Sequence, residues 1–327
     1  MELNQAIEFI RKGDNFLLSS HTNPDGDGVG SILGMLGLLN NLGKKYKIVC
    51  QDVPQDKLSF LKRFDEFTQF EPGMVGKYSF DYAIIIDSPF LERIGEPAKL
   101  FNKGVKILNI DHHVDGGNFG AVNLVVPEAA ASAQIVAAIY ERMEVEPDLA
   151  SAEALYVGLV IDTGRFRYSN TTSDVFLLAA KLLSAGVQPD IVSDRLFYQT
   201  SIENKRGLAK TLASIELHFG GTVASAFLDY DFLNSPDAKD IDTEGFVNQP
   251  LSLKGVEAAF LIRESEKGKT RVSLRSRSDE MDVNKIARTF GGGGHVRASG
   301  CKIDGTIPDV KARILSAIQD YVASSKP

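Results

Sequence analysis

Residues 16–31 read "FLLSSHTNPDGDGVGS", and this stretch decides the class of fold. An apolar run at 16–18 leads into a polar segment containing His21, Asp25 and Asp27, and then into a glycine-rich start of another apolar segment. This order predicts a buried strand, a turn and a helix, as in a parallel sheet covered by helices. Asn, Pro, Asp and Gly all favour turns, so the polar residues alone could simply shape a turn. At the mouth of a buried strand they could equally hold a cation.

Length and composition indicate a two-domain globular protein. The 327 residues exceed a usual single-core domain, and the content of 43% hydrophobic and 24% charged residues is ordinary. The two cysteines, Cys50 and Cys301, form no C-x-x-C pattern, which argues against disulfides or a thiolate zinc site and suits a reducing compartment. The N-terminus does not resemble a targeting segment, and no apolar run approaches the roughly 18 residues of a membrane span. We therefore expect a cytoplasmic protein without a membrane partner.

The net charge of −7 is unevenly distributed along the chain. Residues 263–302 carry +5, and the remainder carries −12. An acidic total is unfavourable for binding long duplex nucleic acid, because that affinity comes largely from neutralising phosphates. The asymmetry instead suits a small anionic ligand held between an acidic and a basic module.

The order of apolar segments predicts an α/β fold with two domains. In the first half, strands at 15–20, 46–51, 82–86 and 105–110 alternate with or precede helices at 29–42, 131–144, 149–161, 173–185 and 188–198. Residues 201–218 read as a helical connector. Beyond it, strands at 222–229, 256–264 and 269–277, a helix at 282–290, a glycine-rich loop and a helix at 308–323 predict an α+β module. We expect a parallel-sheet catalytic domain over 1–187 with helices on both faces, a helical linker over 188–218, and a smaller domain over 219–327 across a cleft.

Acids and histidines follow at the ends of four predicted elements. They are His21, Asp25 and Asp27, then Asp87, then Asp111, His112 and His113, and finally Asp162. The carboxyl ends of parallel strands lie along one sheet edge, where ligands bind in open α/β folds, so these residues can converge. Separately, Asp87 could start a turn and Asp111 could cap a segment. Asp162 is harder to explain locally, because an acid at a helix C-terminus opposes the helix dipole by roughly 0.3–1 kcal/mol.

Such a cluster requires cations. Two carboxylates ~4 Å apart repel by about 4 kcal/mol at an effective dielectric constant near 20. Oxygen and imidazole ligands without thiolates suit Mn²⁺ or Mg²⁺, and histidine favours Mn²⁺. Two such ions roughly 3.5–4 Å apart turn a bridging water into hydroxide for attack on phosphorus and clamp the phosphoryl oxygens. Asp87, alone at its strand end, is the expected bridge between them.

Two stretches of the second module can bind phosphate. In "TRVSLRSR" the period of two places Arg271, Ser273, Arg275 and Arg277 on one face, although this could be an ordinary solvated face. In "GGGGHVRASG" (291–300) a glycine run lets the backbone approach a ligand closely, and His295 and Arg297 add polar groups. A flexible linker is the alternative explanation for that run.

With these motifs the sequence resembles the DHH–DHHA1 phosphoesterase superfamily, and within it the stand-alone oligoribonuclease and 3′-phosphoadenosine-5′-phosphate (pAp) phosphatase branch, the nanoRNases. The matching motifs are "HTNPDGDGVGS", "IIIDSP", "DHH", "GLVIDTGRFRYSNTT" and "GGGGHVRASG". The resemblance implies two divalent ions. One would bind His21, Asp25 and Asp87, and the other would bind Asp27, Asp87, His112 and Asp162.

The resemblance also implies roles outside the metal ligands. His113 would be catalytic, contacting the scissile phosphate or assisting the leaving group, while Asp111 would be structural. His295 and the adjacent Gly293 and Gly294 would bind the far phosphate or terminal nucleotide of the substrate. Three further substrate-binding residues rest on their chemistry alone: Arg165, Arg275 and Arg297.

The function expected from the resemblance is hydrolysis of short single-stranded oligoribonucleotides to mononucleotides, together with dephosphorylation of pAp to AMP. The alternatives are a phosphodiesterase of linear or cyclic dinucleotides such as pApA, and a manganese-dependent pyrophosphatase, which would carry a different basic C-terminal signature. A non-catalytic nucleotide-binding protein would have lost metal ligands. Single-strand binding through Phe166 and Tyr168 is a further option. The oligomeric state is open, a homodimer included.

Overall fold

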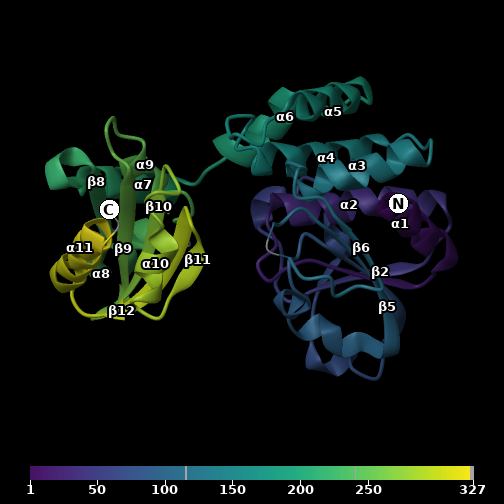
Figure 1. Cartoon of the computed structure of the whole chain (residues 1–327), viewed down its shortest axis with the longest axis horizontal. Helices are drawn as coiled ribbons and strands as arrows, with labels where there is room; N and C mark the ends of the chain where they lie inside the picture. Colours follow the sequence, from purple (N-terminus) through teal and green to yellow (C-terminus); the bar gives the residue numbers. More distant parts are fainter. Residues whose placement is uncertain (115, 240, 325–327) are drawn as a thin grey trace. The chain divides into compact units, whose positions relative to one another are not determined.

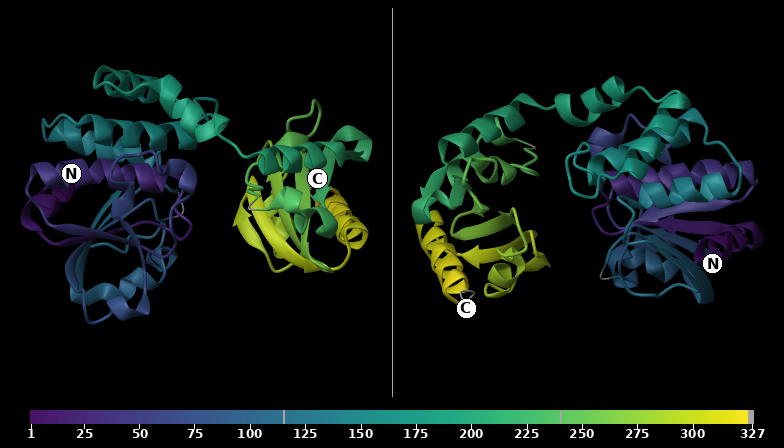
Figure 2. Two further views of the ribbon diagram at one scale, coloured as in Figure 1. Left: turned by 180° about the vertical axis from the view of Figure 1, so that it is seen from behind. Right: turned by 45° about the horizontal axis from the view of Figure 1, so that its top comes forward.

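The computed structural model describes residues 1–114, 116–239 and 241–324. The chain forms two compact units, Met1–Gln199 and Thr200–Pro327, each with its own hydrophobic core (Figures 1 and 2). The finer division expected from the sequence, with a separate linker over 188–218, stays a prediction.

The first unit is built on a six-stranded, all-parallel sheet in the order β3-β2-β1-β4-β5-β6. Its strands begin and end as follows: β1 Phe16–Ser19, β2 Tyr46–Cys50, β3 Phe67–Gln69, β4 Phe80–Ile86, β5 Phe101–Asp111 and β6 Val122–Val125. The apolar runs of β1, β2 and β4 become buried on both faces, as expected for a parallel sheet.

Helical segments cover both faces of this sheet, which confirms the predicted α/β class. The α-helices are α1 Glu2–Lys12, α2 Gly26–Asn41, α3 Ser132–Arg142, α4 Leu149–Asp162, α5 Ser173–Ser184 and α6 Pro189–Ser193, which a π-helical turn, Asp194–Tyr198, continues. The core that includes α1 to α4 lies on one face. Short 3₁₀ helices, Leu91–Ile94 and Glu96–Leu100, pack on the other.

Helices α2 and α4 pack closely because glycines line their contact. A Cβ atom at Gly30 would lie 2.3 Å from the carbonyl oxygen of Ala154, and one at Gly158 would lie 2.7 Å from Oδ1 of Asp27. The helices run antiparallel, so the first turn of α2 meets the last turn of α4. This contact brings Asp27 and Asp162, 135 residues apart in sequence, to the same end of the helix pair.

The second unit has a mixed sheet in the order β11-β12-β10-β9-β8-β7, antiparallel except between β8 and β9. Its strands are β7 Glu216–His218, β8 Val223–Leu228, β9 Ala258–Glu266, β10 Lys269–Ser276, β11 Gly293–His295 and β12 Ala298–Asp304. Its helices are α7 Ile202–Ala213, α8 Tyr230–Leu233, α9 Asn248–Leu251, α10 Val283–Arg288 and α11 Ile307–Ser324. The predicted smaller α+β module is confirmed.

Two local predictions in the second unit are wrong. The expected helix over 201–218 ends at Ala213, and Glu216–His218 pairs with β8 as an edge strand. The expected glycine-rich loop contains β11, which pairs with β12, so the glycines belong to a sheet edge. Both errors concern edge strands of three residues, which are too short to show an alternating pattern.

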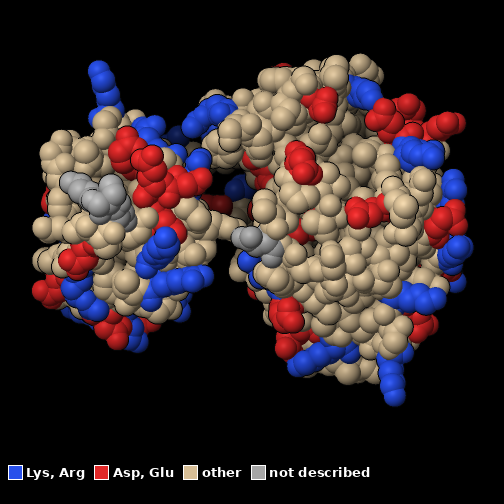
Figure 3. Space-filling view, in the orientation of Figure 1, with Lys and Arg blue, Asp and Glu red and all other residues tan. Residues whose placement is uncertain are grey.

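Among the described residues, no single helix is both long and apolar enough to cross a bilayer; the bent pair Ser173–Ser184 and Pro189–Tyr198 reaches that length and composition only jointly. On the face drawn in Figure 3, Lys and Arg side chains are interspersed with Asp and Glu.

Candidate active site

The predicted metal ligands and His113 lie at the carboxyl edge of the parallel sheet. The strand order reverses between β1 and β4, and ligands of doubly wound sheets bind at such a reversal. The chain leaves β1 two residues before His21, and it leaves β4 immediately before Asp87. Strand β5 ends at Asp111, directly before His112. These strand ends therefore deliver their side chains to one edge.

The start of α2 holds two carboxylates in different ways. Asp25 is the N-cap, and its Oδ1 accepts hydrogen bonds from the backbone N–H groups of Asp27 (2.9 Å) and Gly28 (3.2 Å). Asp27 is fully buried and accepts from the backbone N–H groups of Ser132 (2.6 Å) and Ala133 (2.9 Å) at the start of α3. Ala131, at the N-cap position of α3, has no side chain that could accept a hydrogen bond from the first turn of that helix. The carboxylate of Asp27, from α2, accepts those hydrogen bonds instead.

Asp162 lies at the last position of α4, before a strained turn. Gly164, Arg165 and Phe166 all have left-handed backbones, with φ of 57°, 64° and 61°. For the two non-glycine residues this costs roughly 1–2 kcal/mol each. The hydroxyl of Thr163 accepts from the N–H of Phe166 (3.1 Å) and stabilises the turn. Strain of this kind persists at functional sites when the surroundings compensate for it.

Asp87 lies between two histidines and is itself in a left-handed conformation, with φ of 57°. Its Oδ2 is 3.5 Å from Nε2 of His21, and its Oδ1 is 3.6 Å from Nε2 of His112. The carboxylate is only 2% exposed. Its two oxygens thus face different partners, as a ligand shared between two ions requires.

Both histidines present the same ring atom to the carboxylates. Nδ1 of His21 donates to the carbonyl oxygen of Thr22 (2.8 Å), and Nδ1 of His112 donates to that of Ala129 (3.3 Å). Because Nδ1 carries the proton in each case, Nε2 is the atom available to a metal ion.

The remaining distances define two adjacent clusters, which meet where Asp87 approaches His112. His21, Asp25 and Asp87 form one, and Asp27, His112 and Asp162 form the other, with possible ligand atoms within 4.8 Å of one another in each. In the second cluster, Nε2 of His112 is 3.1 Å from Oδ2 of Asp162 and 3.9 Å from Oδ2 of Asp27. The structure therefore brings together all six residues predicted as metal ligands.

His113 belongs to a different arrangement. Its Nδ1 donates to Oδ1 of the fully buried Asp111 at 2.7 Å and lies 3.7 Å from Oδ1 of Asp87. A third possible metal group joins His113 to Asp87 and His112. We do not count His113 among the metal ligands, because its Nδ1 already donates a hydrogen bond to Asp111. Asp111, expected to hold the loop, orients this imidazole.

The electrostatics of the cluster fit divalent cations. Burial raises the pKa of Asp27 well above its ordinary value, and the charges of Asp162 and Asp87 raise it further. Burial likewise raises the pKa of Asp162 to about 6. Burial opposes protonation of His112, but hydrogen bonds to Asp162 and Asp87 outweigh it and raise the pKa to about 11. Without metal the cluster retains protons, and dications would replace them.

The sequence interpretation missed the segment that holds the ligands in place. Residues 129–133, "AAASA", act mainly through the backbone: Ala129 binds His112, while Ser132 and Ala133 bind Asp27. The hydroxyl of Ser132 also donates to Oδ1 of Asp87 at 3.5 Å. Asn170 donates to the carbonyl oxygens of Ala130 and Asp162, both at 3.1 Å. Alanines carry no side-chain chemistry, so only Ser132 and Asn170, the latter within the "SNTT" part of the fourth motif, offered a side chain to recognise beforehand.

The structure separates the predicted substrate-binding residues into groups. Gly293, Gly294 and His295 form β11, and His295 pairs with Ala298 in β12. Arg297 lies in the turn between these strands, with its Nε 2.7 Å from Oδ1 of Asp279. The ring of Phe197 lies 4.0 Å from the guanidinium of Arg165, which follows Asp162 in the first unit.

The predicted arginine face of β10 is only partly available to a ligand. Arg275 lies opposite Ala298. Arg277 lies beyond the end of β10 and donates to the carbonyl oxygens of Val256 (2.6 Å) and Leu251 (2.7 Å). Arg277 therefore fastens the segment that follows α9.

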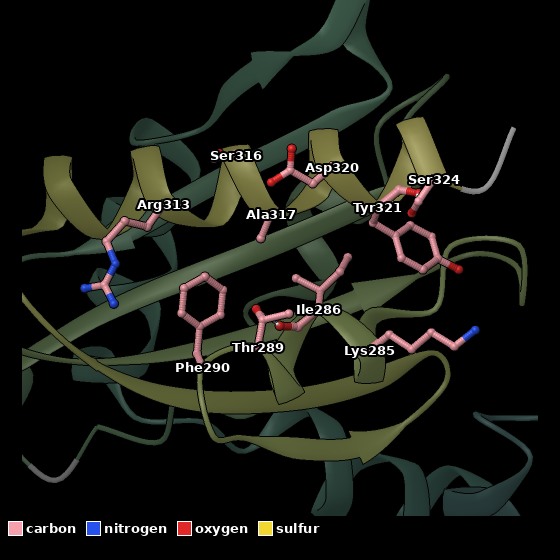
Figure 4. A pocket seen from close by; sticks show the side chains of 10 residues that line it. All are labelled: Lys285, Ile286, Thr289, Phe290, Arg313, Ser316, Ala317, Asp320, Tyr321 and Ser324. Atoms are coloured by element: carbon pink, nitrogen blue, oxygen red, sulfur yellow. Dashed lines mark hydrogen bonds between the residues drawn. The ribbon is translucent and has the colours of Figure 1, made fainter.

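A cavity of about 630 Å³ lies between α10 and α11 in the second unit. Figure 4 shows Arg313 and Phe290 at one end and Lys285 and Tyr321 at the other. None of the predicted site residues lines this cavity. The candidate active site is therefore defined by the side chains that converge at the edge of the parallel sheet.

Comparison with known proteins identifies the class that this fold and site define. The DHH family, N-terminal domain, matches residues 15–159, and the DHHA1 domain matches residues 220–324. The chain belongs to the DHH–DHHA1 family, whose phosphoesterases are metal-dependent. The predicted family and enzyme class are confirmed.

Individual proteins are similar to this chain along most of its length. The chain is 32% identical to the bifunctional oligoribonuclease and PAP phosphatase NrnA of Thermus thermophilus, over 93% of this chain and 89% of that one. It is 27% identical to the protein of the same name from Bacillus subtilis, over 91% and 92%. The crystal structure of an exopolyphosphatase-related protein from Bacteroides fragilis superposes with a TM-score of 0.92 at 25% identity, covering 100% of this chain and 98% of that one.

Proposed function

We propose that this protein is a two-metal phosphoesterase that hydrolyses short oligoribonucleotides to mononucleotides and removes a phosphate from pAp to give AMP. The observation that carries the proposal is the convergence of Asp27, Asp87, His112 and Asp162 from four separate elements. The relatives named for these two activities are matched along nine-tenths of the chain, which supports the same substrates here.

The proposed ligand sets are those expected from the sequence. His21, Asp25 and Asp87 hold one ion, while Asp27, Asp87, His112 and Asp162 hold the other. Their oxygen and imidazole donors suit Mn²⁺ best, with Mg²⁺ as the alternative. Bound there, the pair would supply an activated water and stabilise negative charge on the phosphoryl oxygens.

The chain's own residues complete the proposed chemistry. Asp111 holds Nδ1 of His113, and Nε2 of that ring would form a hydrogen bond to the scissile phosphate or to the leaving oxygen. In the second unit, β11 combines a closely approachable glycine backbone with His295, and it binds the far phosphate of the substrate.

A substrate panel tests the proposal. Hydrolysis of pAp, di- to pentaribonucleotides, linear and cyclic pApA, pyrophosphate and a long RNA is measured with Mn²⁺ and with Mg²⁺. We expect the highest kcat/KM for pAp and the short RNAs, with Mn²⁺ more effective. Preference for pyrophosphate or for a cyclic dinucleotide would replace the proposed substrate class. Nucleotide binding without turnover under any metal would show a non-catalytic protein.

A further inference from the structure

One face of the second sheet is covered only over part of its width. The core of α10 and α11 packs on the face that carries Val272 and Ile303. On the opposite face, apolar residues around Leu228 and Leu261 are buried over β8 and β9. Over β10 and β12 that same face carries the exposed Arg271, beside Ser273 and Arg275. Strands β12 and β10, which follow β11 in the sheet (Figure 1), therefore carry exposed side chains on this face.

Three cations form a row across this face. Arg271 of β10 lies opposite Lys302 of β12 on one side and opposite Arg263 of β9 on the other. Residues directly opposite in antiparallel strands have Cβ atoms ~4.5–5.5 Å apart and point to the same face. Like charges so placed are destabilising. The row is unfavourable unless an anion lies over it.

Arg263 is the strongest indication that an anion belongs there. Its Nη1 donates to the hydroxyl of Thr243, and its Nη2 donates to that of Ser273 at 3.2 Å, while its buried Nε has no hydrogen-bond partner. Within the described parts of the chain, no ion pair connects Arg263, Arg271 or Lys302 to an acid. Charged groups largely removed from water are normally paired, so this guanidinium lacks an ion-pair partner of its own. Burial and the charge of Arg271 lower its pKa, and the charge of Asp242, beyond ion-pair distance, offsets this only in part.

We propose that the row Lys302–Arg271–Arg263, with the hydroxyl of Ser273, binds a backbone phosphate of an RNA strand. The inference rests on the proposed function, since it extends the binding of short RNA from the end held at β11 to a second, distal phosphate. A guanidinium fork matches phosphate oxygens in geometry, and a hydroxyl can donate beside it.

The spacing along β10 sets the length of the strand. Arg275 lies in the same cross-strand row as His295, since both lie opposite Ala298. Arg271 is four residues further along, about 14 Å away at roughly 3.4 Å per residue. This distance spans roughly two to four nucleotides, fewer for an extended backbone than for a stacked one. The distal row therefore contacts oligomers and is out of reach of pAp.

The experiment compares substrates of different length. The full-length Arg271→Ala protein and the wild type are assayed with Mn²⁺ on pAp and on a pentaribonucleotide. We expect KM for the pentamer to rise about five- to tenfold, with KM for pAp and kcat for both unchanged. Binding of a fluorescent pentamer to the metal-free proteins should become less salt-dependent, by about one unit of logarithmic slope. Lys302→Ala should act in the same direction.

Lys311→Ala is the matched control, because it removes the same charge from α11, whose core lies on the opposite face. An equal rise of KM for pAp and pentamer in Arg271→Ala, or an unchanged pentamer KM and salt slope, overturns the proposal. If the wild type hydrolysed none of these substrates, the proposed function would be refuted but the cation row would not. Binding of the fluorescent pentamer would still decide whether the row binds RNA.

Discussion

At the scale of single residues, Asp87 links the two halves of the candidate metal centre. Its two oxygens face His21 and His112, and the residue is almost fully buried. Its φ of 57° is a left-handed conformation whose energetic cost the surrounding packing compensates. A residue with this geometry affects both clusters when it is changed.

Asp87→Asn should therefore reduce kcat at least ~100-fold, because an amide neither carries the charge nor serves as a bridging ligand. Bound metal, counted by elemental analysis, should fall below two ions per chain. Asp81→Asn, on the exposed part of β4, is the control and should retain both activity and metal. Full activity of Asp87→Asn would exclude the bridging assignment.

His295→Ala should mainly raise KM, by about tenfold, since the proposal places this ring on the substrate and away from the reacting phosphate. His218→Ala provides the matched control: His218 lies in the same unit and bonds the hydroxyl of Ser225 (2.8 Å). Steady-state kinetics on pAp measure both. A drop in kcat with unchanged KM would remove the docking role.

The stability of the metal-free protein should fall as pH rises. Burial opposes protonation of His21, but the hydrogen bond and charge of Asp87 raise its pKa from 6.5 to about 9. The pKa of His112 is raised further, to about 11. The folded state thus binds more protons than the unfolded state above pH 6.5, so this stabilisation is fully present below that pH and is lost as pH rises towards 9.

Urea unfolding in the presence of a chelator, at several values between pH 6 and 9, measures this dependence. Added Mn²⁺ should abolish or reverse the slope, because metal binding replaces those protons and favours deprotonated ligands. Stability that increases over this range without metal would show that the histidines are neutral in the folded protein.

At the scale of elements, the contact between α2 and α4 builds half of the site. Glycines let the two backbones approach, and the antiparallel arrangement places Asp27 and Asp162 at the same end. The segment that leads into α3 then fixes both Asp27 and His112 through backbone groups. Helix packing, more than loop chemistry, sets the distances among these ligands.

Gly158→Ala should disrupt this arrangement, because the new Cβ would lie 2.7 Å from Oδ1 of Asp27 and 2.8 Å from Cβ of Ala133. We expect a loss of about 1–3 kcal/mol in unfolding free energy and weaker binding of the second ion, measured by denaturation and metal titration. Gly73→Ala, where the added Cβ would meet nothing within 4 Å, should change neither. Normal metal affinity in Gly158→Ala would show that the helices can separate without moving Asp27.

At the scale of the whole molecule, each unit has its own core and one buried cysteine. Burial raises the pKa of both Cys50 and Cys301 to about 11, so neither thiol reacts readily while its unit is folded. Thiol labelling therefore reports the opening of each unit separately.

Mn²⁺ should slow the labelling of Cys50 in mild denaturant and leave that of Cys301 unchanged, because all proposed metal ligands lie in the first unit. Mass spectrometry of the labelled peptides distinguishes the two sites, and Cys301 serves as the internal control. Equal protection of both thiols would show that the units unfold together.

The sequence by itself determined the parallel sheet, the α+β module, the family, and which acids and histidines follow the strand ends. These features depend on apolar runs and local motifs, which are readable along the chain. Only the tertiary structure decided the roles of residues 129–133 and Asn170, the hold of Asp111 on His113, and the cation row on the second sheet. Those roles arise from backbone groups and cross-strand neighbours distant in sequence, and their positions become defined only when helices and strands pack.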